Sequence, residues 1–597
     1  MSNLIRLSMI VYQNTKSGFL EDVLSGSIVN LLETLTKEIL NVTVSPSEKR
    51  SWENSLSKMY MVLNASKMED DVIVAIEYQI PATSKRIDFL AVSDKKLFIV
   101  ELKQWESIEK TSMPNIVKTY LGRKVREVVH PSYQVYSYKR FIEDFNEFVR
   151  KNLEIIPVVF MHNMSKNSDF LDYDIVEKTE VFFKEDTKKL AEFLAVKAPK
   201  KDILEKIDAS ALSPSKSLVD AIVSMLEGNE EFILLDDQRV VFEKALSLKP
   251  KSVFIVKGGP GSGKSVVAVN LLAEFLKKGK NVRYVTKNLA PREVYKSKLK
   301  GKFKNKVIDS LFTSSGSFTT TLENEFDVLI VDEAHRLNEK SGLFAKGENQ
   351  IKEIINSSKV SIFFIDEDQK VTFKDIGSVD EIKKWANELG AKVYEDELTS
   401  QFRCNGSDGY LAWLDDVLEI KNTANKTLEG IEYDFRVFDD VNEMYETLNK
   451  YKNSAIVAGY CWDWVSKKED VDDIVIGNFS KKWNLADDGA LWIMKNSLNQ
   501  IGCIHTVQGL EVDYIGVIIG NDLRYEDGII TDPSKRAKTD KSLSGYKKML
   551  KEDPLKAEGM ADQIIKNTYR VLMSRGMKGC FVYCADKNLK EYLRKRI

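Results

Sequence analysis

The residues best suited to chemistry form a glycine-rich loop between two apolar runs, the first ending at Val256 and the second beginning at Val266. The loop residues are Gly258, Gly259, Pro260, Gly261, Ser262, Gly263, Lys264 and Ser265. Glycines at this spacing let backbone N–H groups surround phosphates, and the N-terminus of the following helix adds a positive partial charge. Lys264 would contact the β- and γ-phosphates, and Ser265 would bind Mg²⁺. The loop therefore predicts a nucleoside-triphosphate site.

Two carboxylates and two amides could complete this site. Asp332 and Glu333 follow the apolar run 326–331. Asp332 suits the Mg²⁺ shell, and Glu333 suits the general base that positions the attacking water. Gln369 follows another apolar run, where its amide could sense the γ-phosphate, and Gln238 lies upstream of the loop, where its amide could pair with the N6/N7 edge of adenine. The order of these groups around the loop favours function over scattered surface residues.

A third set of candidate residues, Asp88, Glu101 and Lys103, lies in the front part of the chain. Two β-rich runs flank residues 93–96, which are a plausible hairpin turn. In that hairpin Asp88 lies opposite Glu101, with Cβ atoms about 5 Å apart, and the carboxylates repel unless a divalent cation lies between them. Lys103 projects from the same face as Glu101 and could orient the attacking water or neutralise transition-state charge. These residues alone leave two interpretations open, a metal-dependent hydrolytic site and a charged, solvated hairpin.

The elements that position these residues follow from the apolar pattern. Beyond residue 231, apolar runs alternate with amphipathic stretches, which is typical of parallel-sheet α/β domains. The segment 185–230 contains two short proline- and lysine-containing stretches and is predicted to be a helical linker. With 597 residues, the chain is long enough for three or four domains.

Composition limits the class of protein. The 88 basic residues nearly balance the 90 acidic residues, so a nucleic-acid partner must be held by local patches rather than by overall charge. Without a signal pattern or a run of about 18 apolar residues, we expect a soluble, cytoplasmic protein with no membrane partner. The five cysteines form no C-x-x-C pair, which favours free thiols over a zinc or iron–sulfur site.

Together with the loop and its companions, three further motifs, at 398–403, 504–511 and 569–576, resemble those of a superfamily 1 helicase motor, in which two RecA-like domains clamp ATP. The resemblance implies ATP and Mg²⁺ as cofactors and Arg403 and Arg575 as arginine fingers. It also implies that Thr506 contacts a nucleic-acid phosphate and that Gly509 and Glu511 face the nucleotide ribose. The predicted strand-contacting loop contains Lys287 and Asn288.

Further signatures, at 458–464, 482–484 and 567–572, resemble the bacterial relatives of the Schlafen-type DNA/RNA helicase group. The similarity covers residues 231–597. Residues 332–335 also spell the DEAH box of superfamily 2, but the Ser-Ala-Thr tripeptide and the Q-x-x-G-R-x-x-R motif of that superfamily are absent from the sequence.

Gln134 and Tyr138, four residues apart on one predicted helical face, follow the hairpin. With Asp88, Glu101 and Lys103 they resemble the PD-(D/E)xK nucleases, in particular the RecB-like members. The resemblance implies that the Gln134 helix braces the active site and that Mg²⁺, or Mn²⁺, is bound there. A further acid that many relatives carry on an earlier helix is assigned to Glu53, with Glu77 as the competing candidate.

The sequence thus predicts an α/β protein with a PD-(D/E)xK restriction-endonuclease-like domain (1–184), the linker, and two tandem RecA-like P-loop domains (231–400 and 401–597). Its expected function is an ATP-dependent helicase or translocase coupled to a metal-dependent nuclease, directed at DNA rather than RNA, in bacterial antiphage defence or DNA processing. Two alternatives stay open: a motor fused to a degenerate, binding-only nuclease fold, and a nucleotide-gated nucleic-acid sensor. A homo-oligomer or a defence-system partner protein is compatible with each.

Overall fold

The computed structural model describes most of the chain and groups it into two compact units. The described residues are 10–40, 44–80, 85–121, 124–199, 203–209, 234–288, 292–293, 296, 308, 310–340, 347–399, 408–423, 425–431, 433–466, 468–483, 498–507 and 512–597. The first unit comprises Met1–Ser217 and Phe232–Ser247, and the second comprises Leu218–Glu231 and Leu248–Ile597.

The first unit is built on a six-stranded mixed sheet with the order β1-β2-β3-β4-β8-β9. Neighbouring strands from β1 to β4 are antiparallel, whereas β4, β8 and β9 run parallel. The strands of this sheet are β1 (Ile10–Thr15), β2 (Ile73–Gln79), β3 (Arg86–Val92), β4 (Lys96–Lys103), β8 (Glu154–Met161) and β9 (Glu180–Phe183). A small antiparallel sheet inserted after β4 contains β5 (Glu109–Lys110), β6 (Ile116–Leu121) and β7 (Lys124–Val129).

Helices cover the mixed sheet because their apolar faces share its core. Ser45 caps α3 by accepting a hydrogen bond from Glu48 N, and Pro46 occupies the first turn. Residues of α3 spaced three or four apart, including Trp52, Leu56 and Met59, then pack with sheet residues and with α7. On another side, α4 packs on β4 and β8. The helices of this unit are α1 (Lys16–Leu24), α2 (Ile28–Leu40), α3 (Pro46–Ala65), α4 (Pro131–Phe145), α5 (Glu147–Asn152), α6 (Ser168–Leu171), α7 (Thr187–Phe193), α8 (Ile203–Ala209) and α10 (Asp236–Ser247).

The second unit contains two parallel sheets, of order β12-β11-β13-β14-β10-β15 and β16-β23-β20-β17. The strands of the first are β10 (Ser252–Gly258), β11 (Val282–Val285), β12 (Phe312–Thr313), β13 (Phe326–Val331), β14 (Ser358–Ile365) and β15 (Lys392–Leu398). The strands of the second are β16 (Asp434–Phe438), β17 (Ser454–Ala458), β20 (Val512–Ile519) and β23 (Gly576–Cys584). Two hairpins, β18 (Ile474–Ile476) with β19 (Phe479–Lys481) and β21 (Leu523–Tyr525) with β22 (Ile529–Thr531), lie outside these sheets. The predicted α/β fold class is confirmed.

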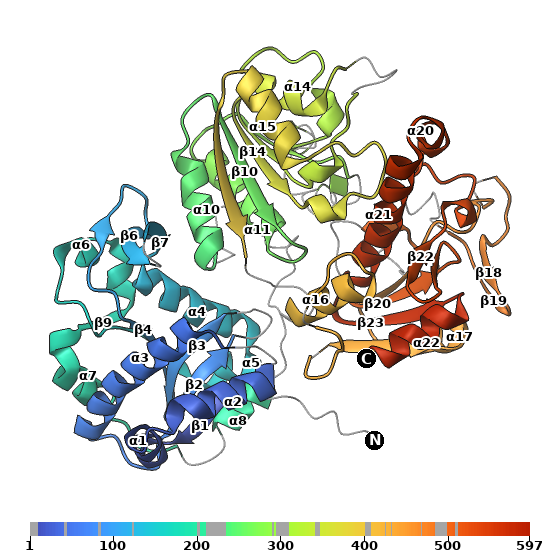
Figure 1. The fold of residues 1–597 in the computed structure, drawn as a ribbon. Helices are drawn as coiled ribbons and strands as arrows, with labels where there is room; N and C mark the ends of the chain where they lie inside the picture. Colours follow the sequence, from blue (N-terminus) through green and yellow to red (C-terminus); the bar gives the residue numbers. More distant parts are fainter. Residues whose placement is uncertain are drawn as a thin grey trace. The chain divides into compact units, whose positions relative to one another are not determined.

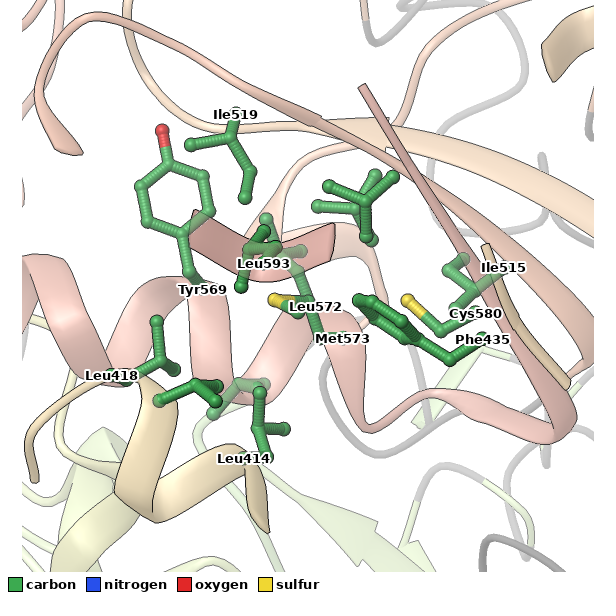
Figure 2. Close-up of a cluster of buried hydrophobic side chains, with 14 of the residues drawn as sticks. Leu414, Leu418, Phe435, Ile515, Ile519, Tyr569, Leu572, Met573, Cys580 and Leu593 are labelled. Atoms are coloured by element: carbon green, nitrogen blue, oxygen red, sulfur yellow. The ribbon is translucent and has the colours of Figure 1, made fainter. Parts of the chain in front are cut away.

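Helices flank both parallel sheets (Figure 1). Apolar residues of α14 and α15 join one core with β10, β13 and β14, while α11 packs on β11, β13 and β14. In the second sheet, α16, α21 and α22 contribute to a core that includes Leu414, Leu572 and Leu593, seen in Figure 2. The helices are α11 (Lys264–Lys277), α14 (Gln350–Ser357), α15 (Val379–Glu388), α16 (Asp408–Val417), α17 (Val441–Leu448), α19 (Ile504–Val507), α20 (Tyr546–Glu552), α21 (Pro554–Met573) and α22 (Lys587–Lys595).

Among the described residues, no helix combines the length and the apolar character needed to cross a membrane. The four described cysteines, Cys461, Cys503, Cys580 and Cys584, are free thiols, as predicted, whereas Cys404 lies outside the described residues.

Candidate active sites

The phosphate-binding loop joins β10 to α11 in the predicted strand–loop–helix arrangement. Gly261 and Gly263 have φ of 79° and 83°, in the left-handed region that glycine adopts without strain. A Cβ on Gly258 would lie 2.5 Å from Ser262 Oγ, so the loop tolerates only glycine there. The Lys264 ammonium donates hydrogen bonds to the carbonyls of Gly258 (2.7 Å) and Gly259 (2.8 Å). The loop has the shape that phosphate binding requires, and its lysine lies over it.

The two predicted Mg²⁺ ligands of this loop lie in contact with each other. Ser265 Oγ donates a hydrogen bond to Asp332 Oδ2 at 2.7 Å, and the Tyr284 hydroxyl donates to the same oxygen. A hydroxyl and a carboxylate oxygen are hard ligands, and Mg²⁺ at phosphate sites commonly uses one or two carboxylates plus phosphate oxygens and water. The donor set therefore fits Mg²⁺ bound together with a nucleotide.

Glu333 is held in a strained position beside this pair. Its φ of 55° lies in the left-handed region, which is uncommon for a residue with a side chain. Burial and the neighbouring charge of Asp332 raise the pKa of Glu333 to about 6, while Lys264 and Arg575 act in the opposite direction. A carboxylate with this pKa is largely ionised at neutral pH yet basic enough to accept a proton from water.

The imidazole of His335 lies against Glu333. Its Nε2 is 3.1 Å from Glu333 Oε2, and its Nδ1 accepts a hydrogen bond from the backbone N–H of Asp366. Burial lowers the pKa of His335 well below its usual range, so the ring is neutral, and the accepting Nδ1 leaves the proton on Nε2. His335 thus presents an N–H toward the candidate base and orients it.

Gln369 connects the two sheets of the second unit. Its Nε2 donates to Asp366 Oδ2 at 2.7 Å, and its Oε1 accepts from Arg575 Nη2 at 3.5 Å. Asp366 Oδ2 is also 4.0 Å from Lys264 Nζ. Arg575 is buried and anchored by a hydrogen bond from Nε to the Val571 carbonyl. The predicted γ-phosphate sensor and the predicted arginine finger therefore meet in a chain of contacts that reaches the lysine of the loop.

The predicted nucleic-acid contacts are engaged within the protein. Lys287 Nζ donates to Asn338 Oδ1 (2.8 Å) and Asp375 Oδ1 (3.1 Å), and burial lowers its pKa to about 8. Asn288 is buried, with no hydrogen-bond partner for Nδ2 in the described part of the chain. Thr506 Oγ1 donates to the Cys503 carbonyl and accepts from Cys503 N. The role of these residues in binding nucleic acid remains a prediction.

Several predicted nucleotide contacts cannot be placed beside the loop. Arg403, Gly509 and Glu511 lie outside the described residues. Gln238 is buried in α10, which belongs to the first unit, and its Oε1 accepts a hydrogen bond from Leu235 N. The predicted contact of Gln238 with adenine therefore stays a prediction.

The candidate nuclease site lies on the β3–β4 hairpin of the first unit. Val92 pairs with Leu97, and Phe89 pairs with Val100, so continuing the same register places Asp88 opposite Glu101, as predicted. Asp88 Oδ2 accepts a hydrogen bond from the backbone N–H of Leu102 at 2.7 Å.

Glu101 and Lys103 project from one face of β4 and form an ion pair of 2.5 Å between Nζ and Oε1. Burial raises the pKa of Asp88, and burial with the charge of Asp88 raises that of Glu101 to about 8. Glu101 Oε2 is buried and finds no hydrogen-bond partner among the described residues. Two facing carboxylates, one with an orphaned oxygen, fit a divalent cation, which would satisfy that oxygen and offset the repulsion.

The α4 helix supplies the two remaining nuclease candidates. Gln134 Nε2 donates to the Tyr138 hydroxyl at 2.9 Å, because residues four apart share a helical face. Burial, followed by the charges of Asp236 and Glu101, raises the pKa of Tyr138 well above its usual value. Asp88, Glu101, Lys103, Gln134 and Tyr138 therefore share one electrostatic environment.

Of the two candidates for an additional acid, Glu77 lies nearer the site. Glu53 is exposed on α3, whereas Glu77 is buried, accepts a hydrogen bond from Trp52 Nε1 (2.7 Å) and pairs with Arg86 (3.0 Å). Burial raises the pKa of Glu77 to about 7, and the charge of Asp88 contributes. The sequence could have placed Glu77 near Asp88 only if the pairing of β2 with β3 had been recognised.

Sequence reasoning missed three polar residues at these sites: Asp366, Tyr284 and Asp236. Asp366 directly follows β14, and the ends of parallel strands collect functional side chains, so that signal was available. Tyr284 and Asp236 act through contacts between distant parts of the chain. Among the described residues, no group of three or more His, Cys, Asp or Glu side chains is arranged to hold a metal. Each candidate metal site thus rests on two protein ligands.

Comparison with known proteins found similarity in both halves of the chain. Residues 53–162 match the nuclease-related domain. An uncharacterised protein of Saccharomyces cerevisiae, YPL245W, is 26% identical over 389 residues, which cover 58% of this chain and 84% of the yeast protein. Among solved structures, Pif1 helicase from Candida albicans is 13% identical, and the match covers 61% of this chain and 100% of the Pif1 chain with a TM-score of 0.28. Arterivirus nonstructural protein 10, a helicase, is 12% identical, and the match covers 57% of this chain and 62% of the viral chain with a TM-score of 0.26.

A second family match covers more than half of the chain. Residues 251–586, from the start of the phosphate-loop strand to the last helix, match the family described as Schlafen group 3, DNA/RNA helicase domain. The predicted resemblance of the motor half is therefore confirmed, and it is joined to a nuclease-related front half. The chain belongs to the Schlafen group 3 DNA/RNA helicase domain family.

Proposed function

We propose that this chain is an ATP-driven nucleic-acid translocase or helicase coupled to a metal-dependent nuclease, with DNA as its main substrate. The observation that carries the proposal is the contact chain from Lys264 through Asp366 and Gln369 to Arg575. It links the phosphate loop to a guanidinium on the second parallel sheet, as expected of a motor that closes on ATP. A role in bacterial antiphage defence or DNA processing fits the union of a motor with a nuclease.

In the proposed ATP site, each side chain has a separate task. Lys264 would exchange the loop carbonyls for phosphate oxygens, and Ser265 and Asp332 would hold Mg²⁺. When bound, Mg²⁺ neutralises phosphate charge and orients the transferred group. Glu333 accepts a proton from the attacking water, and Arg575 stabilises the charge that develops on the γ-phosphoryl group. Because Gln369 contacts Arg575, a change at the ATP site on hydrolysis can be transmitted between the two parallel sheets of the second unit.

In the proposed nuclease site, Asp88 and Glu101 would hold the divalent cation. Such a cation polarises the phosphodiester and lowers the pKa of its bound water. Lys103 then donates hydrogen bonds to the attacking water or to the phosphate oxygen that gains charge. Gln134 fixes the Tyr138 hydroxyl and so shapes the phosphate-facing wall of the site.

The test measures both activities in the full-length protein at a stated ionic strength, because phosphate binding depends strongly on salt. ATP hydrolysis and strand cleavage are followed with single-stranded and duplex DNA and RNA, in Mg²⁺ and in Mn²⁺. We expect single strands to stimulate ATP hydrolysis, and DNA to be cut faster than RNA. Lys264→Ala should abolish hydrolysis, and Lys103→Ala should abolish cleavage while sparing hydrolysis.

Matched controls come from exposed lysines of the same elements. Lys277→Ala, at the far end of α11, should leave hydrolysis unchanged, and Lys96→Ala, at the start of β4, should leave cleavage unchanged. Cleavage that survives Lys103→Ala contradicts the nuclease assignment. Hydrolysis that no nucleic acid stimulates contradicts the motor assignment and favours a nucleotide-gated sensor.

A further inference from the structure

A carboxylate from outside the nuclease motifs enters the nuclease site. Asp236, the first residue of α10, accepts a hydrogen bond on Oδ2 from the Tyr138 hydroxyl at 3.1 Å. The same oxygen pairs with Lys85 Nζ at 3.0 Å. Both donors belong to the first unit, as does α10. Asp236 therefore holds two donors of the nuclease region at once.

These donors share the electrostatic environment of the nuclease candidates, since the charge of Lys103 acts on Lys85 and that of Glu101 acts on Tyr138. Tyr138 is the side chain that Gln134 fixes, and its pKa reflects the charges of both Asp236 and Glu101. Lys85 directly precedes β3, the strand that carries Asp88. A tyrosine hydroxyl and a lysine ammonium are common partners of nucleic-acid phosphates. The same pair also suits a carboxylate, since both ligands are anions with oxygen acceptors.

The conformation of Asp236 is costly for the protein. Its φ of 34° lies in the left-handed region, where residues with side chains are strained. Its Oδ1 is buried and has no hydrogen-bond partner in the part of the chain that the structure describes. Its negative charge also adds to those of Asp88 and Glu101, and it contributes to the raised pKa of Glu101. A residue held in this way is poised to leave when a better ligand for its donors arrives.

We propose that Lys85 and Tyr138 form a phosphodiester-binding subsite of the nuclease, and that Asp236 is an internal anion that occupies this subsite until nucleic acid displaces it. The inference rests on the proposed nuclease function and adds its regulation. We do not interpret Asp236 as a third metal ligand, because the described residues contain no group of three acids arranged for a metal. Asp236 instead faces two hydrogen-bond donors.

The test compares wild-type, Asp236→Asn and Asp236→Gly full-length proteins in single-strand DNA cleavage with Mn²⁺. Asn keeps the shape and removes the charge, while Gly also removes the backbone strain. Each variant should lower the KM for the DNA and raise kcat/KM about tenfold, because one partly buried like charge no longer competes with phosphate. Glu154→Gln, which removes the charge of an exposed carboxylate on β8, should change kcat/KM by less than about twofold. Adding Tyr138→Phe to Asp236→Asn, which removes one of the two donors, should abolish the fall in KM and so place the effect at this subsite.

The outcomes separate the inference from the proposed function. If wild type cuts and both Asp236 variants cut no better, or more slowly through a lower kcat, the internal-anion proposal is wrong while the nuclease stands. If neither wild type nor the variants cut any of the nucleic acids, the nuclease function itself is wrong. ATP hydrolysis, measured on each variant, should stay at the wild-type rate and shows that the motor is folded.

Discussion

The two candidate sites use the same kinds of side chain in opposite electrostatic settings. In the second unit, Asp332 and Glu333 are consecutive residues, and the cations that offset Glu333 are Lys264 and Arg575. In the first unit, the acids come from two strands, and Glu101 is surrounded by further carboxylates, with Lys103 as its ion-pair partner.

This difference in charge favours a different kind of ligand at each site. Burial is the largest cause of both raised pKa values. The pKa of Glu333 is about 6, with two cations, Lys264 and Arg575, acting against burial. The pKa of Glu101 is about 8, with one cation, Lys103, acting against burial and the charge of Asp88. The two cations beside Glu333 suit an incoming phosphate chain, which brings negative charge toward them. The neighbouring acids at Glu101 suit an incoming divalent cation, which relieves the repulsion between them. The four predictions that follow are ordered from the largest expected effect to the smallest, and each could break this comparison.

Removing the guanidinium from the ATP site should have the largest effect. Arg575→Ala should lower the nucleic-acid-stimulated kcat of ATP hydrolysis about 10³-fold, because transition-state charge on the γ-phosphoryl group is no longer offset. Arg575→Lys should recover part of the loss, since it restores the charge without the planar fork. Steady-state phosphate release measures both. Lys578→Ala, an exposed cation three residues away, is the control, and equal losses in all three variants would show a structural role instead.

Removing one acid from the nuclease site should affect cleavage alone. Glu101→Gln should lower cleavage about 10²-fold, because the cation loses one of its two protein ligands. Gel-resolved cleavage and ATP hydrolysis are measured on the same preparation. Glu154→Gln, an exposed carboxylate on the neighbouring strand β8, should behave as wild type. A parallel fall in ATP hydrolysis would contradict the separation of the two sites.

Breaking the contact between the sheets of the second unit should have an intermediate effect. Gln369→Ala removes the acceptor of Arg575 and the donor to Asp366, and we expect ATP hydrolysis to fall about tenfold. The KM for ATP should change less than kcat, because Gln369 positions Arg575 rather than the bound nucleotide. A change confined to KM would assign Gln369 to nucleotide binding.

The smallest prediction concerns pH and the stability of the first unit. The pKa of Glu77 is raised from 4.5 to about 7 by burial, so the folded state binds its proton more tightly than the unfolded state. The stabilisation that this proton provides is complete below about pH 4.5 and is lost as pH rises to about 7, at up to about 1.4 kcal/mol per pH unit. Urea unfolding followed by tryptophan fluorescence reports on Trp52, which donates to Glu77. Glu77→Gln should remove this slope, and an unchanged slope would assign it to other groups.

How far the sequence predicts the site depends on the range of the contacts. The Asp88–Glu101 register followed from a four-residue turn, and the Ser265–Asp332 pair followed from two motifs whose strands lie in one parallel sheet. These positions are set by local geometry or by strand ends. Contacts that arise through tertiary packing could not be predicted from a sequence pattern. Lys287, predicted to contact nucleic acid, donates hydrogen bonds to Asn338 and Asp375.

The assignment of α10 shows the same limit at the level of domains. The residues from 231 onward read as the start of the motor, because Gln238 stands ahead of the phosphate loop. In the structure, α10 groups with the first unit, where the guanidinium of Arg239 lies over the ring of Tyr133. Helical periodicity predicts that α10 exists, but it carries no information about which sheet the helix will join.

The membership of α10 means that the two units cannot be separated by a single cut. A front-half fragment ending at residue 184 or 230 would lack α10, leaving the buried Tyr138 hydroxyl without Asp236 and the Tyr133 ring without Arg239. A fragment meant to fold as the whole front unit must run through Ser247, only five residues before the phosphate-loop strand begins at Ser252. Recombination between such proteins would therefore preserve the nuclease only if the exchanged segment ran past the predicted linker and included α10.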